Sequence, residues 1–232
     1  MSFFARVFKH KDGAANAGKS KHTAAAAHGN GHPIVPVKPR FTATWASKEI
    51  DADEVQELIH ACTLELKSRA EALDAPFFIL PFRPETDVSP TRTFITNFYS
   101  ANHAGSELYT GVSLHKELIL TEPAVLCSIL KWCWSRLPGG VVTWPVYEGF
   151  RLGENESLIA RNAFSTFIPL CVDTPARRAI IFDFFDILAT VAAHAKVNGL
   201  VGRKLSRMAA WWAFDHSDEG KGFDGGYKSW AT

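Results

Sequence analysis

Residues 173–214 decide the fold, and they read DTPARRAIIFDFFDILATVAAHAKVNGLVGRKLSRMAAWWAF. The Asp-Thr-Pro start at 173–175 is typical of a helix N-terminus, because proline suits the first helical turn. Apolar residues then recur at three- and four-residue steps, which predicts one long amphipathic helix, the longest of the chain. Gly199 is expected to close this helix, and a last helix is expected from about residue 202 to 214. The repeating apolar positions are Ile180, Ile181, Phe184, Phe185, Leu188, Val191 and Ala192.

The same spacing extends upstream and predicts an all-α domain of about seven to nine helices. One helix begins near residue 50, a second opens at Ser89-Pro90, and a third opens at Pro123. A loop is expected after the second, and shorter helices are expected over 145–152 and 156–167. No two-residue alternation indicates a strand. The expected buried positions are Val55, Leu58, Ile59, Cys62 and Leu66, then Phe94, Ile95 and Phe98, then Val125, Leu126, Ile129, Leu130 and Cys133.

Charge divides the chain into two unlike parts. The formal net charge is only +1, but residues 1–40 carry seven basic residues and one acidic residue, whereas the remaining 192 residues carry 18 basic and 23 acidic. Such asymmetry is typical of a tail joined to a domain. We therefore expect a disordered basic tail at 1–45, a helical domain at 46–215 and a glycine-rich end at 216–232. The near-neutral total argues against nucleic acid as a partner.

The first nine residues combine aromatic rings with cations. Phe3, Phe4 and Phe8 interleave with Arg6 and Lys9, a pattern that suits contact with an anionic membrane surface. The alternative is an ordinary frayed terminus. No apolar run reaches the length of a membrane span, and the start is not a secretory signal.

Searches for catalytic and metal-binding motifs predict neither an enzyme nor a cofactor. The chain has no phosphate-binding glycine loop, dinucleotide fingerprint, zinc-protease motif or nucleophile elbow. The four cysteines lack metal-ligand spacing, so we interpret them as reduced core residues of an intracellular protein. His60 and His194 are expected on a helix surface or hydrogen-bonded in the core. Trp132 and Trp134 lie about 200° apart on one helix, so one of them is a candidate for a partner surface.

Two segments resemble the Rho GTPase-activating (RhoGAP) domain, which implies a RhoGAP-like bundle of helices. Residues 121–150 are similar to its helix with a Leu-Lys-x-x-Leu-Arg-Glu-Leu-Pro ending and the short helix that follows. Residues 168–214 resemble its long helix, its Val-Asn turn and the next helix. The matching positions are Leu130, Lys131, Leu137, Pro138, Tyr147, Phe150, Val197 and Asn198.

Three sequence segments resemble a fungal family of morphogenesis proteins more closely than they resemble the RhoGAP domain. This family is the multicopy suppressor of budding defect and meiotically up-regulated family. The segments are LPFRPETD at 80–87, LKWCWSRLPGGVVTW at 130–144 and RKLSRMAAWWAF at 203–214. Members of that family are implicated in budding, polarity and Rho-type signalling. They typically continue well beyond this length, so the chain is expected to be either an N-terminal fragment or a shortened version of such a protein.

The RhoGAP resemblance implies a GTPase-contacting surface. It comprises Arg83, Lys131, Ser135, Arg136, Asn198 and Lys204. Arg83 stands at the position of the arginine finger, the residue that an activator inserts to neutralise charge on the transferred phosphoryl group. Phe98 follows Arg83 at the family's spacing. However, Pro84-Glu85-Thr86-Asp87 replaces a glycine-containing loop, and proline locks the backbone.

The positions that would support the finger also depart from the pattern. Lys131 matches the family's lysine, but Ser135 stands where the family has an arginine. Arg136 is offset by one residue, about 100° around a helix. Lys204 replaces the asparagine of the family's Asn-Leu-Ala turn. A finger without preorganised donors loses most of its electrostatic effect.

These departures favour a non-catalytic module that binds Rho-family small GTPases or polarity and budding scaffold proteins. Two alternatives stay open. One is an active GTPase activator that uses Arg83 with support from Lys131. The other is a membrane adaptor held at the cell cortex by the basic tail. The resemblance implies a cytoplasmic protein at the cortex or at sites of polarised growth, such as a bud, septum or hyphal tip.

Overall fold

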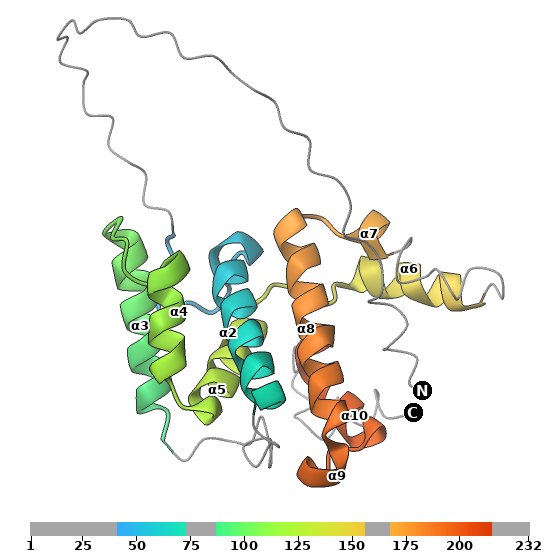
Figure 1. Cartoon of the computed structure of the whole chain (residues 1–232). Helices are drawn as coiled ribbons and strands as arrows, with labels where there is room; N and C mark the ends of the chain where they lie inside the picture. Colours follow the sequence, from blue (N-terminus) through green and yellow to red (C-terminus); the bar gives the residue numbers. More distant parts are fainter. Residues whose placement is uncertain (1–40, 73–86, 156–167, 215–232) are drawn as a thin grey trace, which may run out of the picture. The chain divides into compact units, whose positions relative to one another are not determined.

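All the secondary structure that the described residues form is helical, as the sequence predicts. The structure is a computed structural model that describes residues 41–72, 87–155 and 168–214. These residues form nine helices and no strand (Figure 1). The helices are α2 Ala52–Ala72, α3 Ser89–His103, α4 Gly111–Leu120, α5 Pro123–Trp134, α6 Trp144–Asn155, α7 Ile168–Cys171, α8 Pro175–Ala193, α9 Ala195–Asn198 and α10 Gly202–Ala213. The helix expected over 156–167 lies outside the described residues.

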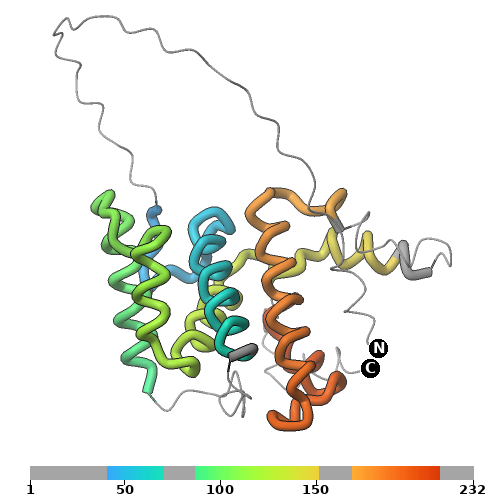
Figure 2. Tube along the Cα trace, in the orientation of Figure 1, coloured from blue at the N-terminus to red at the C-terminus, as the bar shows by residue number. Residues whose placement is uncertain are grey.

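Helix α2 lies at the centre of the domain, between α4 and α8, and it also packs against α5 (Figure 2). Its predicted apolar face is fully buried: Val55, Leu58, Ile59, Cys62 and Leu66 are all 0% exposed. With 21 residues, α2 is longer than α8 with 19, so the expectation that the helix opened at 173–175 is the longest was wrong.

The chain begins to pack before the expected domain boundary at residue 46. Phe41 and Ala43 are buried. The Phe41 ring stacks on Phe98 of α3 at 5.9 Å between centroids and meets Tyr99 edge-on at 6.1 Å. Helix α3 opens at Ser89-Pro90 and buries Phe94, as predicted. Residues 41–45 therefore contribute to the core that α3 helps to form.

Helix α4 occupies part of the stretch that we expected to be a loop. It buries only Leu114 and Leu118, so its apolar pattern is short. A cation from α2 holds its end: the Arg69 guanidinium donates to the carbonyls of Leu118, Ile119 and Thr121. Carbonyl groups at a helix C-terminus lack helical partners, so this contact satisfies groups that would otherwise need water.

Helix α5 is covered on both sides, and neither of its two tryptophans faces a partner. Trp132 and Trp134 are 6% and 1% exposed. Trp132 stacks on Trp45 with 5.6 Å between ring centroids. Trp134 meets Phe184 of α8 edge-on at 4.9 Å and approaches Trp212 of α10 at 5.6 Å. The hypothesis that one of the pair forms a partner surface was therefore wrong, because the chain before α2 supplies a second buried side.

Helix α8 begins where predicted but ends earlier. Thr174 caps its start by accepting a hydrogen bond from the Arg177 N–H. The helix stops at Ala193, and the short α9 follows, so Gly199 closes α9 and not the long helix. Gly199 has φ +67°, a left-handed conformation that favours glycine. Helix α10 then follows, as the sequence predicts.

Candidate partner-binding site

The residues that the RhoGAP resemblance nominates lie in two places. Lys131, Ser135 and Arg136 lie at the C-terminal end of α5. Asn198 ends α9, and Lys204 lies in the first turn of α10. Arg83 lies outside the described residues, as do the membrane-contact candidates Phe3, Phe4, Arg6, Phe8 and Lys9.

Hydrogen bonds place the two ends of α10 in different surroundings. The N–H groups of Val141 and Val142 donate to the carbonyls of Trp212 and Ala213, so the C-terminal end of α10 lies beside the segment that follows α5. Lys204 lies eight residues before Trp212, which corresponds to about 12 Å along a helix. The structure therefore puts Lys204 a long way down α10 from the turn after α5.

Arg136 is committed to the fold. Its guanidinium carbon lies 4.3 Å from the centre of the Trp132 ring and 5.8 Å from that of Trp45. The guanidinium donates hydrogen bonds to the Ser47 carbonyl, the Trp132 carbonyl and the Ser135 hydroxyl. Burial lowers the pKa of Arg136 from its usual value, opposed by Cys133 and Tyr99. Its donors hold the segment before α2 against the end of α5.

Asn198 is equally committed. It is 4% exposed, and both ends of its amide are bonded. The nitrogen donates to the Val191 carbonyl at 2.8 Å, and the oxygen accepts from the Leu200 N–H at 2.8 Å. These bonds join the end of α8 to the turn before α10, so the side chain does not point toward a partner.

Lys131, Ser135 and Lys204 are the nominated residues with access to solvent. Ser135 and Lys204 are exposed, and Lys131 is half-buried in the last turn of α5. Ser135 also donates to the Trp132 carbonyl at 3.0 Å. Lys131 and Ser135 thus define the solvent-facing part of the α5 end.

Arg177 is a buried cation that the sequence analysis missed. It is 4% exposed and donates to the carbonyls of Gly140 and Pro138, in the turn after α5. Gly139 and Gly140 have φ of +71° and +77°, so this turn needs glycine. Burial lowers the pKa of Arg177, opposed by Asp173, whose carboxylate lies 4.0 Å from Nε. The signal in the sequence was an arginine three residues after the capping threonine of an apolar helix.

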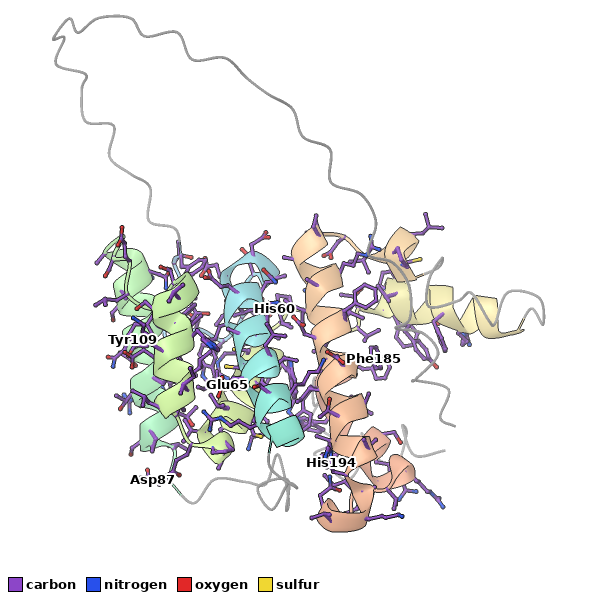
Figure 3. All side chains as sticks on the ribbon, in the orientation of Figure 1. His60, Glu65, Asp87, Tyr109, Phe185 and His194 are labelled. Atoms are coloured by element: carbon purple, nitrogen blue, oxygen red, sulfur yellow. The ribbon has the colours of Figure 1, made fainter. Side chains whose placement is uncertain are left out.

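Charged pairs line the outer edge of the contact between α2 and α8. His60, which Figure 3 labels on α2, has its Nδ1 3.0 Å from Asp183 Oδ1. Lys67 pairs with Asp186. Burial raises the pKa of Asp183, opposed by the hydrogen bond and charge of His60. His60 is exposed and His194 bonds the Thr190 carbonyl, which confirms the expectation for both histidines.

The described residues offer little for other chemistry. Within them, no cluster of three histidine, cysteine or acidic side chains has the geometry to hold a metal ion. None of the helices they form has the length and apolarity to cross a bilayer. A cavity of about 440 Å³ opens beside the start of α8 and contains none of the nominated residues. It is lined by Pro169, Val172, Asp173, Thr174, Pro175, Arg178, Ala179 and Phe182.

Comparison with known proteins identifies the family. The model of the meiotically up-regulated protein Msb1/Mug8 domain matches residues 49–232. The chain belongs to the Msb1/Mug8 domain family. The match begins just before α2 and includes every described helix of the domain.

Two curated relatives of this Msb1/Mug8 domain come from yeasts. The morphogenesis-related protein MSB1 of Saccharomyces cerevisiae is 29% identical over 170 residues, which cover 72% of this chain and 14% of MSB1. The meiotically up-regulated gene 8 protein of Schizosaccharomyces pombe is 25% identical over 190 residues, which cover 77% of this chain and 26% of that protein. The chain thus spans 14% of one relative and 26% of the other. No solved structure matches it.

Proposed function

We propose that this Msb1/Mug8 domain is a non-catalytic module that binds Rho-family GTPases or polarity proteins during fungal morphogenesis, at the cell cortex or sites of polarised growth. The link to morphogenesis comes from the name of a relative, MSB1. We infer the absence of catalysis from one observation: the side chains of Arg136 and Asn198 make hydrogen bonds within the domain. Arg136 lies one residue from the position of a finger-supporting arginine, and Asn198 was a candidate for the GTPase-contacting surface.

A working activator needs donors aimed at the place where charge develops in the transition state. Arg136 donates to the carbonyls of Ser47 and Trp132, and its guanidinium covers the Trp132 ring. Moving it toward a nucleotide would break those bonds and expose the ring. The Asn198 amide has both of its ends bonded inside the domain. These commitments support binding without catalysis.

The surface that we assign to a GTPase is the end of α5, where Lys131 is half-buried and Ser135 is exposed. A cation at the last turn of a helix is favourably placed against the helix dipole, so Lys131 can serve folding and binding together. A lysine on the rim of an interface increases the rate of association with an acidic partner surface.

The proposal is tested by isothermal calorimetry of the whole chain with Rho-family GTPases loaded with a GTP analogue or with GDP. Binding to at least one of them is expected. Lys131→Glu should weaken that binding about tenfold or more by charge reversal. Lys116→Glu, an exposed lysine on α4, makes the same charge change elsewhere and serves as the control. Absence of binding to every GTPase and to polarity proteins would remove the proposal.

A further inference from the structure

The turn between α9 and α10 gathers cations and exposed apolar groups. We call this surface the basic corner: Lys196, Val197, Val201, Arg203, Lys204 and Arg207. Lys196, Arg203 and Lys204 are exposed, Arg207 is partly exposed, and the two valines are 52% and 58% exposed. Figure 3 labels His194, which lies where α8 ends and this corner begins.

The segment of chain that carries the corner contains no acidic residue. Residues 187–214 contain no aspartate or glutamate. In the part of the chain that the structure describes, its four cations take part in no ion pair. A surface with unpaired cations of one sign attracts an anionic partner.

The three cations of α10 project from one side of the helix. Leu205, Ala209 and Ala213 form its buried face. At about 100° per residue, Arg203, Lys204 and Arg207 fall within an arc of about 100° on the opposite side. They therefore present a continuous positive surface to solvent, beside the exposed turn.

The position of these cations in α10 does not favour helix stability, which indicates that they have a role other than folding. The start of α10 has no capping side chain and no acidic residue in its first turn. Arg203 and Lys204 stand in that turn, where the helix dipole disfavours positive charge. Residues that break a local rule without a compensating contact indicate a functional surface. An anion bound beside Arg203 and Lys204 would offset their unfavourable interaction with the helix dipole.

We propose that the basic corner contacts the surface of a bilayer that contains anionic lipids. Cations beside exposed apolar side chains fit such a surface, because the cations meet lipid headgroups while the valines enter the boundary with the acyl chains. Among the residues that the structure describes, no acidic side chain holds any of the four cations in a fixed orientation. Recognition of a single carboxylate would favour such a preorganised pair of donors. The proposal is independent of GTPase binding, because it rests on residues at the other end of α10 from the α5 end.

The test is co-sedimentation of the whole chain with phosphatidylcholine vesicles that do or do not contain phosphatidylserine. Wild type should partition to the anionic vesicles and lose that binding as ionic strength rises. Arg203→Gln with Lys204→Gln should lower the partition coefficient about 30-fold, from a contribution of roughly fivefold for each cation. Lys48→Gln with Lys116→Gln removes the same charge from exposed sites elsewhere and should change partition less than about threefold.

A second variant separates binding from folding. Val201 is the N-cap residue of α10, with extended backbone angles that suit a capping side chain. Val201→Ser with Val197→Ser removes the apolar contact while serine adds a capping hydroxyl, so lipid binding should fall severalfold without a lower melting temperature.

Two results would overturn the proposal. One is partitioning of the Arg203/Lys204 variant equal to that of its charge-matched control. The other is equal binding of wild type to neutral and anionic vesicles. If the Arg203/Lys204 variant loses GTPase affinity and keeps lipid binding, the corner is a protein interface. Residues 1–40 are identical in all variants, so any contribution from them cancels in each comparison.

Discussion

The guanidinium carbon of Arg136 lies 4.3 Å from the centre of the Trp132 ring, four residues earlier in the chain. The Trp45 ring stacks on the Trp132 ring, with 5.6 Å between the ring centroids. The Ile50 N–H donates to the Arg136 carbonyl at 2.9 Å, which ties the segment before α2 to the end of α5. Arg136, which the RhoGAP resemblance places on a GTPase-contacting surface, therefore holds two parts of the domain together.

Arg136→Gln should lower the free energy of unfolding by about 2 kcal/mol, because it removes a cation–π contact and two part-buried hydrogen bonds. Urea unfolding followed by tryptophan fluorescence measures the change. Arg92→Gln, at an exposed position of α3, is the control and should stay within about 0.5 kcal/mol of wild type. Equal stabilities of the two variants would contradict the structural role of Arg136.

Asn198→Ala should cost about 2 kcal/mol, because it leaves the Val191 carbonyl and the Leu200 N–H without a side-chain partner. Asn198→Asp keeps the acceptor but sets a carboxylate against the Val191 carbonyl, so it should also destabilise. Thermal unfolding measures both, with Asn97→Ala on the exposed side of α3 as the control. A variant of full stability that has lost GTPase affinity would instead place Asn198 in the interface.

Arg177→Met should be more damaging, at about 3 kcal/mol, because the carbonyls of Pro138 and Gly140 lose a buried charged donor. The adjacent Arg178→Met is a matched control. Arg178 is exposed, and its guanidinium carbon lies 5.8 Å from the Phe182 ring centre, a contact of about 0.5 kcal/mol. Chemical denaturation of both variants should separate them by more than about 2 kcal/mol. If the two lose equal stability, the turn after α5 does not depend on Arg177.

Only one of the four thiols should react readily in the folded protein. Burial raises the pKa of the Cys133 thiol to about 12 and raises that of Cys62 well above its usual value. Cys127 is also buried, whereas Cys171 is partly exposed. Because the thiolate is the reactive form, titration with a disulfide reagent at pH 8 should modify Cys171 first and all four after unfolding. Rapid modification of Cys62 or Cys133 in the native state would contradict the packing of α2 against α5.

Periodicity predicted the helices whose apolar faces are long. The buried positions of α2, α3 and α5 follow from three- and four-residue spacing, because each helix has one side against the core. Helix α4 was missed, since it buries only Leu114 and Leu118 and its end is held by Arg69 from another helix. A contact between residues so distant in sequence leaves no local pattern.

The site was harder to predict than the fold. The RhoGAP resemblance places Arg136 and Asn198 among residues for a partner, but their side chains are bonded within the domain. The spacing of a motif does not say which direction a side chain takes at a helix end. Similarly, Trp132 and Trp134 point to opposite sides of α5 and are both buried. Trp132 packs on Trp45, whereas Trp134 packs on Phe184 and Trp212, and these contacts join residues distant in sequence.

Single-turnover GTP hydrolysis tests the central claim most directly. A Rho-family GTPase that binds the whole chain is loaded with GTP. Hydrolysis of the bound GTP is then measured at concentrations of the chain that saturate binding. If the domain is a non-catalytic binding module, the rate of GTP hydrolysis with the wild-type chain equals the intrinsic rate of the GTPase. The rate with Arg83→Ala should be the same. Acceleration by wild type that is lost in Arg83→Ala would show an active arginine finger, worth about 10³–10⁵ in rate, and would contradict the account.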